Sequence, residues 1–336
     1  MAYKIIAGFL VLLVALAFHL HMDMIVLLNL SFIKFAMNGL LVLSLIPMLN
    51  AGMGMNFGLP VGITAGLIGM CIAVNFKLTG LVGLLISALL GGFIALAFSE
   101  VYGRILIAVK GREEIASTFI GFSFIPLMNF FWSLVPFSNR QMLYPIGGSG
   151  LRPRIGLNPY FTSTLDQLWS IKVGNFVLPF GLLLVYGIIA GLIHYFFKTT
   201  SGKSICAVGE NDAFAKASGL NVKKIKLLSV RISLVIAAVG IVVYAQSFGF
   251  LELYDAPLMM AFPAVSALLI GGASAKKGTI IHAIIGTYLF QSIYLLSVPI
   301  ANELLLPEIS EIVRNIITNG IILYALLISE KGGRYA

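Results

Sequence analysis

Three asparagines lie among glycines and prolines in an otherwise apolar stretch of the chain, residues 37–61. An asparagine amide both donates and accepts hydrogen bonds, and a backbone unwound by glycine and proline offers free N–H and C=O groups. Methionine and phenylalanine side chains there would add apolar contact surface, so we predict a broken segment that lines a substrate pathway. A plain helix–turn–helix at the membrane face is the alternative. The predicted pathway residues are Asn38, Asn50, Met53, Met55, Asn56 and Phe57.

A second polar stretch, residues 198–226, combines lysines with small residues. One or two short helices lying on a membrane face would fit this composition, because small side chains allow a partner to approach closely. A solvated loop whose lysines only follow the rule for membrane orientation fits it too. Residues 200–204 resemble the end of a phosphate-binding loop, but Phe197 stands where that loop needs its first glycine. We therefore expect no nucleotide site in this chain.

No arrangement of side chains predicts catalysis or a metal site. The four histidines do not cluster, and Cys71 and Cys206 form neither a disulfide framework nor a metal-binding spacing. No nucleophile with a neighbouring base can be argued from the sequence. We expect a protein that is not an enzyme and needs no cofactor.

The elements that carry these residues are long apolar runs. Hydrophobic residues make up 59% of the 336 residues and charged residues 10%, against about 25% charged residues in a soluble domain. Several runs approach the roughly 20 residues that span a bilayer. We predict an all-α, polytopic transmembrane helical bundle of about 10 spans in a single domain, residues 1–336. The expected spans are 5–20, 25–50, 55–75, 78–102, 115–135, 176–197, 225–245, 258–272, 279–298 and 310–329.

Basic residues are distributed unevenly between the two sides that ten spans create. With the N-terminus inside, 14 of the 22 Lys and Arg residues fall in inner segments and five in outer segments. Because cytoplasmic segments are rich in Lys and Arg, both termini are predicted to be cytoplasmic. The first run lacks a small-residue cleavage site after it, so we interpret it as an uncleaved span. The two longer connections are an external loop, about 136–175, and a cytoplasmic loop, about 198–226.

Ionisable residues are rare inside the expected spans, where Lys34, Glu100 and Arg231 occur. Carriers driven by proton or sodium gradients usually place a carboxylate or histidine near the middle of the membrane, and none stands out here. This absence argues against a secondary transporter and favours a neutral solute. The net charge of +9 arises from short basic gaps between apolar runs, which membrane orientation explains better than nucleic acid binding.

Glycines at short helical spacing occur in two of the expected spans. They are Gly62, Gly66 and Gly69 in one span and Gly187 and Gly191 in another. Small residues at such spacing let two helices approach closely. We therefore predict close helix packing at these glycines.

Residues 202–226 read GKSICAVGENDAFAKASGLNVKKIK. This run resembles the coupling loop of ribose- and nucleoside-type permeases of ATP-binding-cassette (ABC) importers, within the branched-chain-amino-acid/sugar permease superfamily. Three further segments, 109–118, 269–278 and 54–62, resemble other parts of that family's pattern. The resemblance covers roughly residues 30–330.

The resemblance implies a permease subunit with several partners. They would be a cytoplasmic ATPase subunit, an extracytoplasmic solute-binding protein and a second permease subunit, identical or homologous. The bacterial cytoplasmic (inner) membrane is the expected location, with membrane lipids around the chain and no nucleic acid. ATPase coupling is expected at Gly202, Gly209, Asn211, Ala213, Ala217, Gly219, Lys223 and Lys224.

The expected solute is small, neutral and polar, a simple sugar or a nucleoside-like molecule. Gly58 stands where sugar-type members often carry an aspartate, and Lys276 and Lys277 stand where glycines are more usual. Asn56-Phe57-Gly58 is more similar to the Asn-x-Gly of nucleoside-type members, which favours a ligand with an aromatic part. An ion-coupled secondary transporter or channel for a small polar solute is the alternative. Uptake driven by an ion gradient without an ATPase would favour that alternative.

Overall fold

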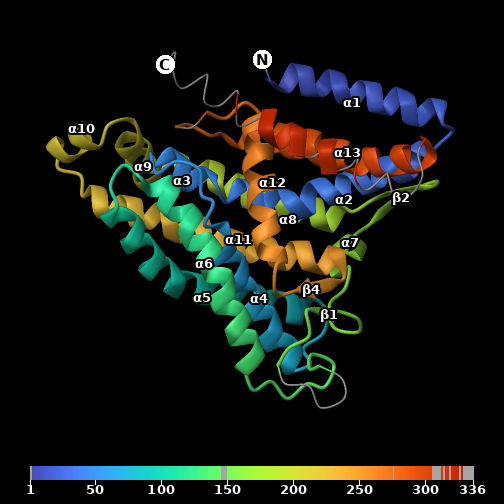
Figure 1. Cartoon of the computed structure of the whole chain (residues 1–336), viewed down its shortest axis with the longest axis horizontal. Coiled ribbons are helices and arrows are strands. Elements are labelled where there is room, and N and C mark those ends of the chain that lie inside the picture. Colours follow the sequence, from blue (N-terminus) through green and yellow to red (C-terminus); the bar gives the residue numbers. More distant parts are fainter. Residues whose placement is uncertain are drawn as a thin grey trace.

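The computed structural model describes residues 2–144, 150–274, 276–304, 312, 315–317, 319–324 and 327, and most of them are helical. The named helices are α1 (Ala2–His19), α2 (Met24–Leu43), α3 (Ile46–Asn50), α4 (Leu59–Asn75), α5 (Gly80–Ala108), α6 (Glu113–Leu134), α7 (Thr164–Gln167), α8 (Phe180–Lys198), α9 (Thr200–Glu210), α10 (Asp212–Ala217), α11 (Val222–Phe248), α12 (Ala256–Ile270) and α13 (Ile280–Leu304). The named strands are β1 (Arg154–Gly156), β2 (Ile171–Val173), β3 (Phe176–Leu178) and β4 (Phe250–Glu252). Figure 1 shows α1 and α13 along one edge of the bundle and α5 and α6 along another.

Among the described residues, six helices are long and apolar enough to cross a membrane. Shorter apolar helices at Lys4–His19, Leu59–Asn75 and Ala256–Ile270 accompany them. The chain is therefore a helical, polytopic membrane protein, as predicted. The last expected span, 310–329, falls only partly on described residues. The six long helices are Met24–Asn50, Gly80–Ala108, Glu113–Leu134, Phe180–Lys198, Val222–Phe248 and Ile280–Leu304.

The chain between α2 and α4 is broken, as the glycines and prolines predict. α2 ends at Leu43, the short α3 follows, and α4 begins at Leu59, four residues later than expected. Gly52 and Gly54 adopt φ angles of 70° and 74°, a left-handed conformation that side chains disfavour. We call residues 44–58 the break.

Prolines and small polar residues set the starts of several helices. Pro47 and Pro60 lie in the first turn of α3 and α4, where the N–H that proline lacks would have no helical partner. The Asp23 carboxylate caps α2 by accepting from the N–H groups of Ile25 and Val26, at 3.0 and 3.1 Å. These local choices agree with the helix boundaries.

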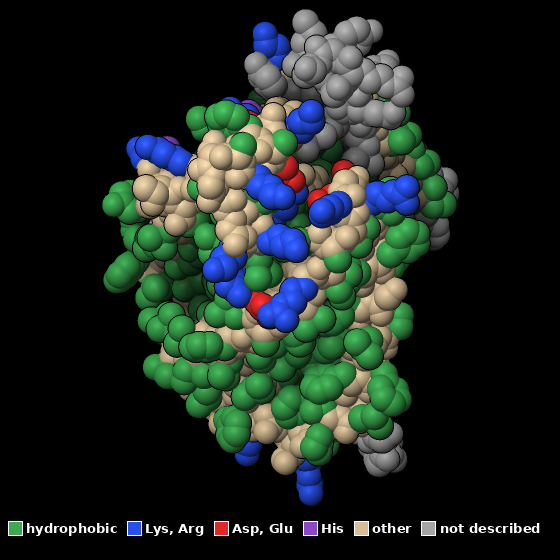
Figure 2. All heavy atoms as spheres, turned by 90° about the vertical axis from the view of Figure 1, so that its left-hand side faces the viewer, with side chains coloured by type: hydrophobic (Ala, Val, Ile, Leu, Met, Phe, Trp, Pro, Cys, Tyr) green, Lys and Arg blue, Asp and Glu red, His purple; other side chains and the backbone are tan. Residues whose placement is uncertain are grey.

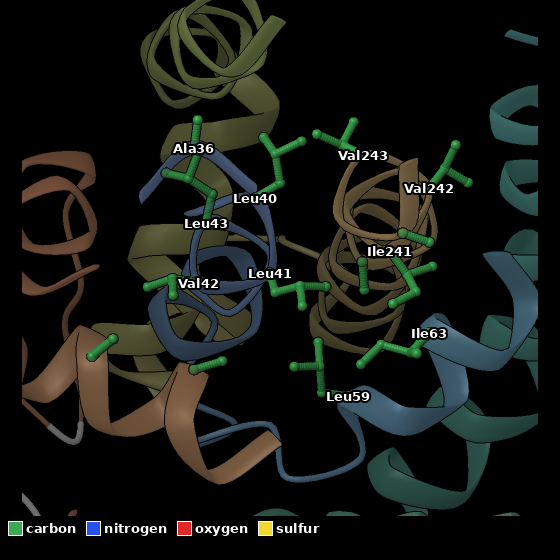
Figure 3. Packing of buried hydrophobic residues seen from close by; sticks show 14 of the residues in the cluster. Ala36, Leu40, Leu41, Val42, Leu43, Leu59, Ile63, Ile241, Val242 and Val243 are labelled. Carbon is green, nitrogen blue, oxygen red and sulfur yellow. The ribbon is translucent and has the colours of Figure 1, made fainter. Parts of the chain in front are cut away.

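α4 packs between α5 and α11 in the centre of the bundle, and its glycines permit this. A Cβ atom at Gly66 would collide with Ile241 and with the Ala238 carbonyl, both on α11. The predicted close packing is confirmed at Gly62, Gly66 and Gly69. Within the described part of the chain, Gly187 and Gly191 make no such contact, because no described atom lies within 4 Å of a Cβ there. Figure 3 shows Leu59 and Ile63 of α4 facing Ile241 of α11, with Leu41 of α2 nearby.

Four short strands differ from the predicted all-helical fold: β1 and β2 lie in the loop 136–175, β3 at the start of the expected span 176–197, and β4 between two expected spans. β1 pairs with β4 in antiparallel register, and β2 pairs with β3 in a tight hairpin. Each strand has only three residues, which is too short for the alternation of polar and apolar residues that predicts a strand. The expectation of an all-helical chain is corrected to this extent.

The bundle has two distinct ends. The β1–β4 sheet lies at one end, and α9 and α10 lie at the other, far left in Figure 1. The stretch 198–226 is almost entirely helical, since α9 and α10 are capped by the side chains of Thr199 and Asn211. The prediction of one or two short helices in that stretch is confirmed.

Candidate functional site

A cavity of about 570 Å³ opens at the β1–β4 end. Its wall is built by α2, α11, α12 and α13, together with β4 and the residues around β1. Small-molecule sites in proteins typically have about 300–1,000 Å³, so the volume suits a small solute. The wall includes Lys34, Asn38, Tyr244, Phe248, Glu252 and Gln291.

The cavity wall combines aromatic rings with hydrogen-bonding side chains. Phe248 and Phe290 offer apolar ring faces, and Asn38 and Gln291 each carry amide donors and an acceptor. Asn38 Nδ2 donates to the Lys34 carbonyl at 2.9 Å, while its amide oxygen has no partner among the described residues. Such a wall can bind hydroxyl groups through the amides while an apolar face of the solute packs on a ring.

Charged groups lie at the rim and in the wall of the cavity. Arg154 Nε and Glu252 Oε1 are 2.6 Å apart on the paired strands β1 and β4. Lys34 Nζ lies 5.9 Å from the centre of the Phe248 ring and has no acidic partner in the described part of the chain. This ammonium group is free to donate to an oxygen atom of a solute.

Tyr254 stabilises the rim beside this ion pair. Burial raises the pKa of the Tyr254 phenol above its usual range, so the hydroxyl is a neutral donor at physiological pH. It donates to the Leu151 carbonyl at 2.8 Å. This bond ties the residues that precede α12 to those that precede β1.

The structure separates the six residues predicted to line a substrate pathway. Asn38 lines the cavity, whereas the other five lie in the break and do not line it. Met53 and Met55 are buried in the hydrophobic core. The Phe57 ring lies 5.2 Å from that of Phe262 on α12.

The asparagines of the break bind the chain's own backbone and side chains. Asn50 brackets Gly278, with Nδ2 donating to its carbonyl at 3.0 Å and Oδ1 accepting from its N–H at 2.9 Å. Asn56 is fully buried. Its Oδ1 accepts from the Tyr102 hydroxyl at 2.6 Å and from the Gly58 N–H at 3.0 Å. These bonds replace helical hydrogen bonds that the break has lost.

The residues expected to contact an ATPase fall into two groups at the α10 end. Gly202 and Gly209 are packed inside the chain, since a Cβ at Gly202 would collide with Phe196 and one at Gly209 with the Asn50 carbonyl. The other six, together with the aromatic ring of Phe214, are exposed on α10 and on either side of it. These six are Asn211, Ala213, Ala217, Gly219, Lys223 and Lys224.

The surface around α10 is basic. Figure 2 looks onto this end and shows Lys and Arg side chains gathered above a broad hydrophobic surface. Phe214, with 69% of its surface exposed, projects among them between small residues. An exposed aromatic ring flanked by alanines on a basic surface suits insertion into a pocket of an acidic partner.

A buried ion cluster joins α10 to the bundle, and sequence analysis did not identify it. Lys226 Nζ lies 2.8 Å from Asp212 Oδ2 on α10 and 3.5 Å from Glu113 Oε1 on α6. The side chains of Lys226 and Glu113 are 9% and 8% exposed, so their charges depend on each other. The cluster holds α10 against the starts of α6 and α11.

One face of α11 leads from this cluster into the break. Ser229, one turn after Lys226, contacts Met53 Sδ at 3.7 Å. Ser233, another turn on, donates to the Ser44 carbonyl at 2.6 Å and accepts from Asn56 Nδ2 at 3.3 Å. The α10 end and the break are therefore linked by polar contacts along a single helix face.

The sequence contains few signals for the cavity wall. Lys34 is a lysine inside an apolar span, a feature that usually marks a functional position. Tyr244 and Phe248 lie one turn apart on α11, whereas Gln291 lies on α13, far along the chain. Only the tertiary structure brings Gln291 to the α11 residues.

Comparison with known proteins gives one family and several curated relatives. The family model described as "Branched-chain amino acid transport system / permease component" matches residues 1–328. The autoinducer 2 import system permease protein LsrC of Yersinia enterocolitica is 32% identical over 117 residues, which are 34% of this chain and 32% of the relative. The galactose/methyl galactoside import permease protein MglC of Haemophilus influenzae is 30% identical over 149 residues, 43% of this chain and 42% of the relative.

A second LsrC protein, from Enterobacter, is 29% identical over 133 residues, which are 39% of this chain and 38% of the relative. The matched stretches thus span between about a third and two fifths of the curated relatives. No solved structure matches the chain.

Proposed function

Since the chain belongs to the family of permease components of branched-chain amino acid transport systems, we propose that it is the membrane-spanning subunit of an ABC importer. Its role is to move a small, neutral, polar solute across the bacterial inner membrane without catalysis of its own. ATP hydrolysis takes place on a separate cytoplasmic ATPase chain. An extracytoplasmic binding protein delivers the solute, and a second permease subunit, identical or homologous, completes the path.

The observation that carries this proposal is a continuous connection between the cavity and α9. The segment α2–α3 lines the cavity at Lys34 and Asn38, and its other end packs Asn50 against Gly209 of α9. A displacement of α9 is therefore passed to a cavity wall through one stretch of backbone. This is the coupling that alternating access requires, with the cavity open to the outside before the ATPases act and to the inside afterwards.

The orientation follows from the charges at the two ends. The α10 end carries the exposed lysines of α9, α10 and the start of α11, and the cytoplasmic side of a membrane protein is the basic one. We place the α10 end in the cytoplasm and the cavity mouth outside. Ten spans with both termini cytoplasmic complete this topology.

A simple sugar is the solute class that the cavity suits best. Amide groups and an ammonium group stand beside phenyl rings, and a sugar presents hydroxyls on its edges and an apolar face. The names of the relatives, import permeases for autoinducer 2 and for galactose or methyl galactoside, point the same way. The preference for a nucleoside rests on the Asn56-Phe57-Gly58 motif together with Met53 and Met55, and none of these residues lines the cavity.

The exposed residues of the α10 end are the proposed ATPase contact. Charge reversal at Lys223 and Lys224, or replacement of Ala213 by leucine, is expected to raise ATP hydrolysis per solute transported. The measurement is parallel ATPase and uptake assays in proteoliposomes. Undiminished coupled transport in these variants would contradict the docking role.

Purification of the tagged chain in a mild detergent tests the class as a whole. Mass spectrometry is expected to find an ATPase chain in stoichiometric amount, together with a solute-binding protein whose ligand identifies the solute. A chain that retains no ATPase even after crosslinking would contradict the proposal. That result would favour an ion-coupled carrier, to be tested by gradient-driven uptake into liposomes.

A further inference from the structure

Three buried hydroxyl groups near the cavity have no hydrogen-bond partner in the described part of the chain. They belong to Ser266 of α12 and to Thr287 and Ser292 of α13. Their residues are 1%, 0% and 3% exposed. Leaving a buried hydroxyl unpaired costs stability, and most buried polar groups in proteins are paired. These three positions need an explanation other than packing.

Two of these hydroxyls lie one turn deeper than the cavity wall. Ser266 follows the wall residue Pro263 by three positions, and Thr287 precedes the wall residue Gln291 by four. Residues at these spacings share one side of a helix. α12 begins at the cavity, and α13 reaches it in its middle, at Phe290, Gln291 and Tyr294. Both steps therefore lead from the cavity toward the end of α12 and the start of α13. That side faces the α10 end, because Gly278, just before α13, bonds to Asn50 beside Gly209 of α9.

α12 and α13 are in close contact at this depth. A Cβ at Gly286 would collide with the Ala267 carbonyl, and Ser266 and Thr287 are the sequence neighbours of these two residues. Further toward the α10 end, His282 Nδ1 also has no partner among the described residues, and its ring lies next to Gly272. Unpaired polar atoms thus continue from the cavity along the α12–α13 contact.

We propose that this seam, formed by Ser266, Thr287, Ser292 and His282, is the closed inner half of the solute path that this chain contributes. When α12 and α13 separate, the seam hydroxyls bond to the hydroxyl groups of the solute as it leaves the cavity amides. Opening breaks no hydrogen bond between the three seam hydroxyls and the described residues, because they make none in the closed arrangement. This inference rests on the proposed transport function, and it assigns the inner half of the solute path to named residues.

The first test compares stability with transport. Ser266→Ala and Thr287→Val remove unpaired hydroxyls, so the unfolding midpoint of the purified chain is expected to stay unchanged or rise. The matched controls are Ser87→Ala and Thr64→Val, whose buried hydroxyls donate to the carbonyls of Gly83 and Pro60. The controls are expected to lower the midpoint by about 2 °C. An equal fall in the seam variants would show that these hydroxyls are structural and would overturn the proposal.

The second test measures water access without any knowledge of the solute. In the assembled transporter, with Cys71→Ala and Cys206→Ser as background, Ser266→Cys and Thr287→Cys are treated with a membrane-impermeant thiol reagent. Labelling is expected to be roughly tenfold faster than at Ser87→Cys, because a thiol kept in apolar surroundings forms little reactive thiolate. Labelling as slow as the control in every nucleotide state would overturn the seam.

The two proposals fail separately. Slow labelling in a complex that contains an ATPase contradicts the seam and leaves the importer function standing. Fast labelling in a chain without an ATPase supports the seam and contradicts the importer function. Transport completes the comparison, since the seam variants are expected to slow uptake by roughly tenfold for one lost bond to the solute, whereas the Ser87→Ala control keeps its rate.

Discussion

The cavity and the break use the same amide side chain in different ways. In the cavity, Asn38 makes one hydrogen bond to a backbone carbonyl and keeps its oxygen available. In the break, Asn56 is fully buried and bonds to Tyr102, Gly58 and Ser233. The cavity can therefore exchange partners with a solute, whereas the break uses its amides to hold an irregular backbone in place. An amide in an apolar span is a binding group only if the protein itself leaves it unsatisfied.

The largest effect is expected where the break meets α9. Gly209→Ala places a Cβ against the Asn50 carbonyl, which is backbone and cannot rotate away. We expect a loss of more than about 3 kcal/mol, at the top of the range for overpacking, and loss of coupled uptake. Denaturant titration and uptake assays measure this. Gly187→Ala is the control, since no described atom lies within 4 Å of its Cβ. Equal effects of the two changes would show that the contact is unimportant.

The ion cluster is the next strongest point of the α10 end. Lys226→Met leaves the buried carboxylate of Glu113 without its partner. We expect a loss of about 3 kcal/mol, the lower end for a broken buried pair, because Asp212 is half exposed. Lys226→Arg is expected to restore most of the stability in the same denaturant titration. Lys276→Met, at an exposed lysine, is the control. A Lys226→Met chain as stable as this control would contradict the cluster's role.

Asn56→Ala tests the break directly. It removes the partners of the Tyr102 hydroxyl and the Gly58 N–H inside the protein, and we expect a loss of about 2 kcal/mol in the free energy of unfolding. Solute affinity of the remaining folded protein should be unchanged. If instead the apparent KM rose while stability held, Asn56 would belong to the solute path as first predicted from the sequence.

Asn38→Ala is expected to affect solute uptake rather than stability, the reverse of Asn56→Ala. Stability should change by less than about 1 kcal/mol, because the lost bond is a single one to a backbone carbonyl. The KM for uptake should rise up to about tenfold if the amide binds a solute hydroxyl. Concentration-dependent uptake measures this. An unchanged KM together with an unfolded chain would remove the contrast between the two regions.

The helical bundle could be predicted from the sequence because membrane spans are set by composition over long stretches. The apolar runs of α5 and α11 predict membrane spans, and Gly52, Gly54 and Pro60 predict the break. α4 begins at Leu59, four residues after the predicted start of the span. Pro60 in the first turn sets this start, rather than the first apolar residue of the run.

The functional contacts could not be predicted because they join residues distant along the chain. In the sequence, Lys226 is one of several lysines that the rule for membrane orientation already explains. Its partner Glu113 lies 113 positions away along the chain. Gln291 and Asn38 line one cavity from different helices. Nothing in the spacing of these residues encodes their proximity, which depends on how α2, α11 and α13 pack.

The depth of the cavity has an electrical consequence. Along α12, Ala264 lines the cavity and the helix ends six residues further on, at Ile270. At 1.5 Å per helical residue this is about 9 Å, against roughly 30 Å of hydrocarbon in a bilayer. In the proposed membrane orientation, with water filling the cavity, the membrane voltage would fall mainly across this thin layer and would act most strongly on the α12–α13 contact.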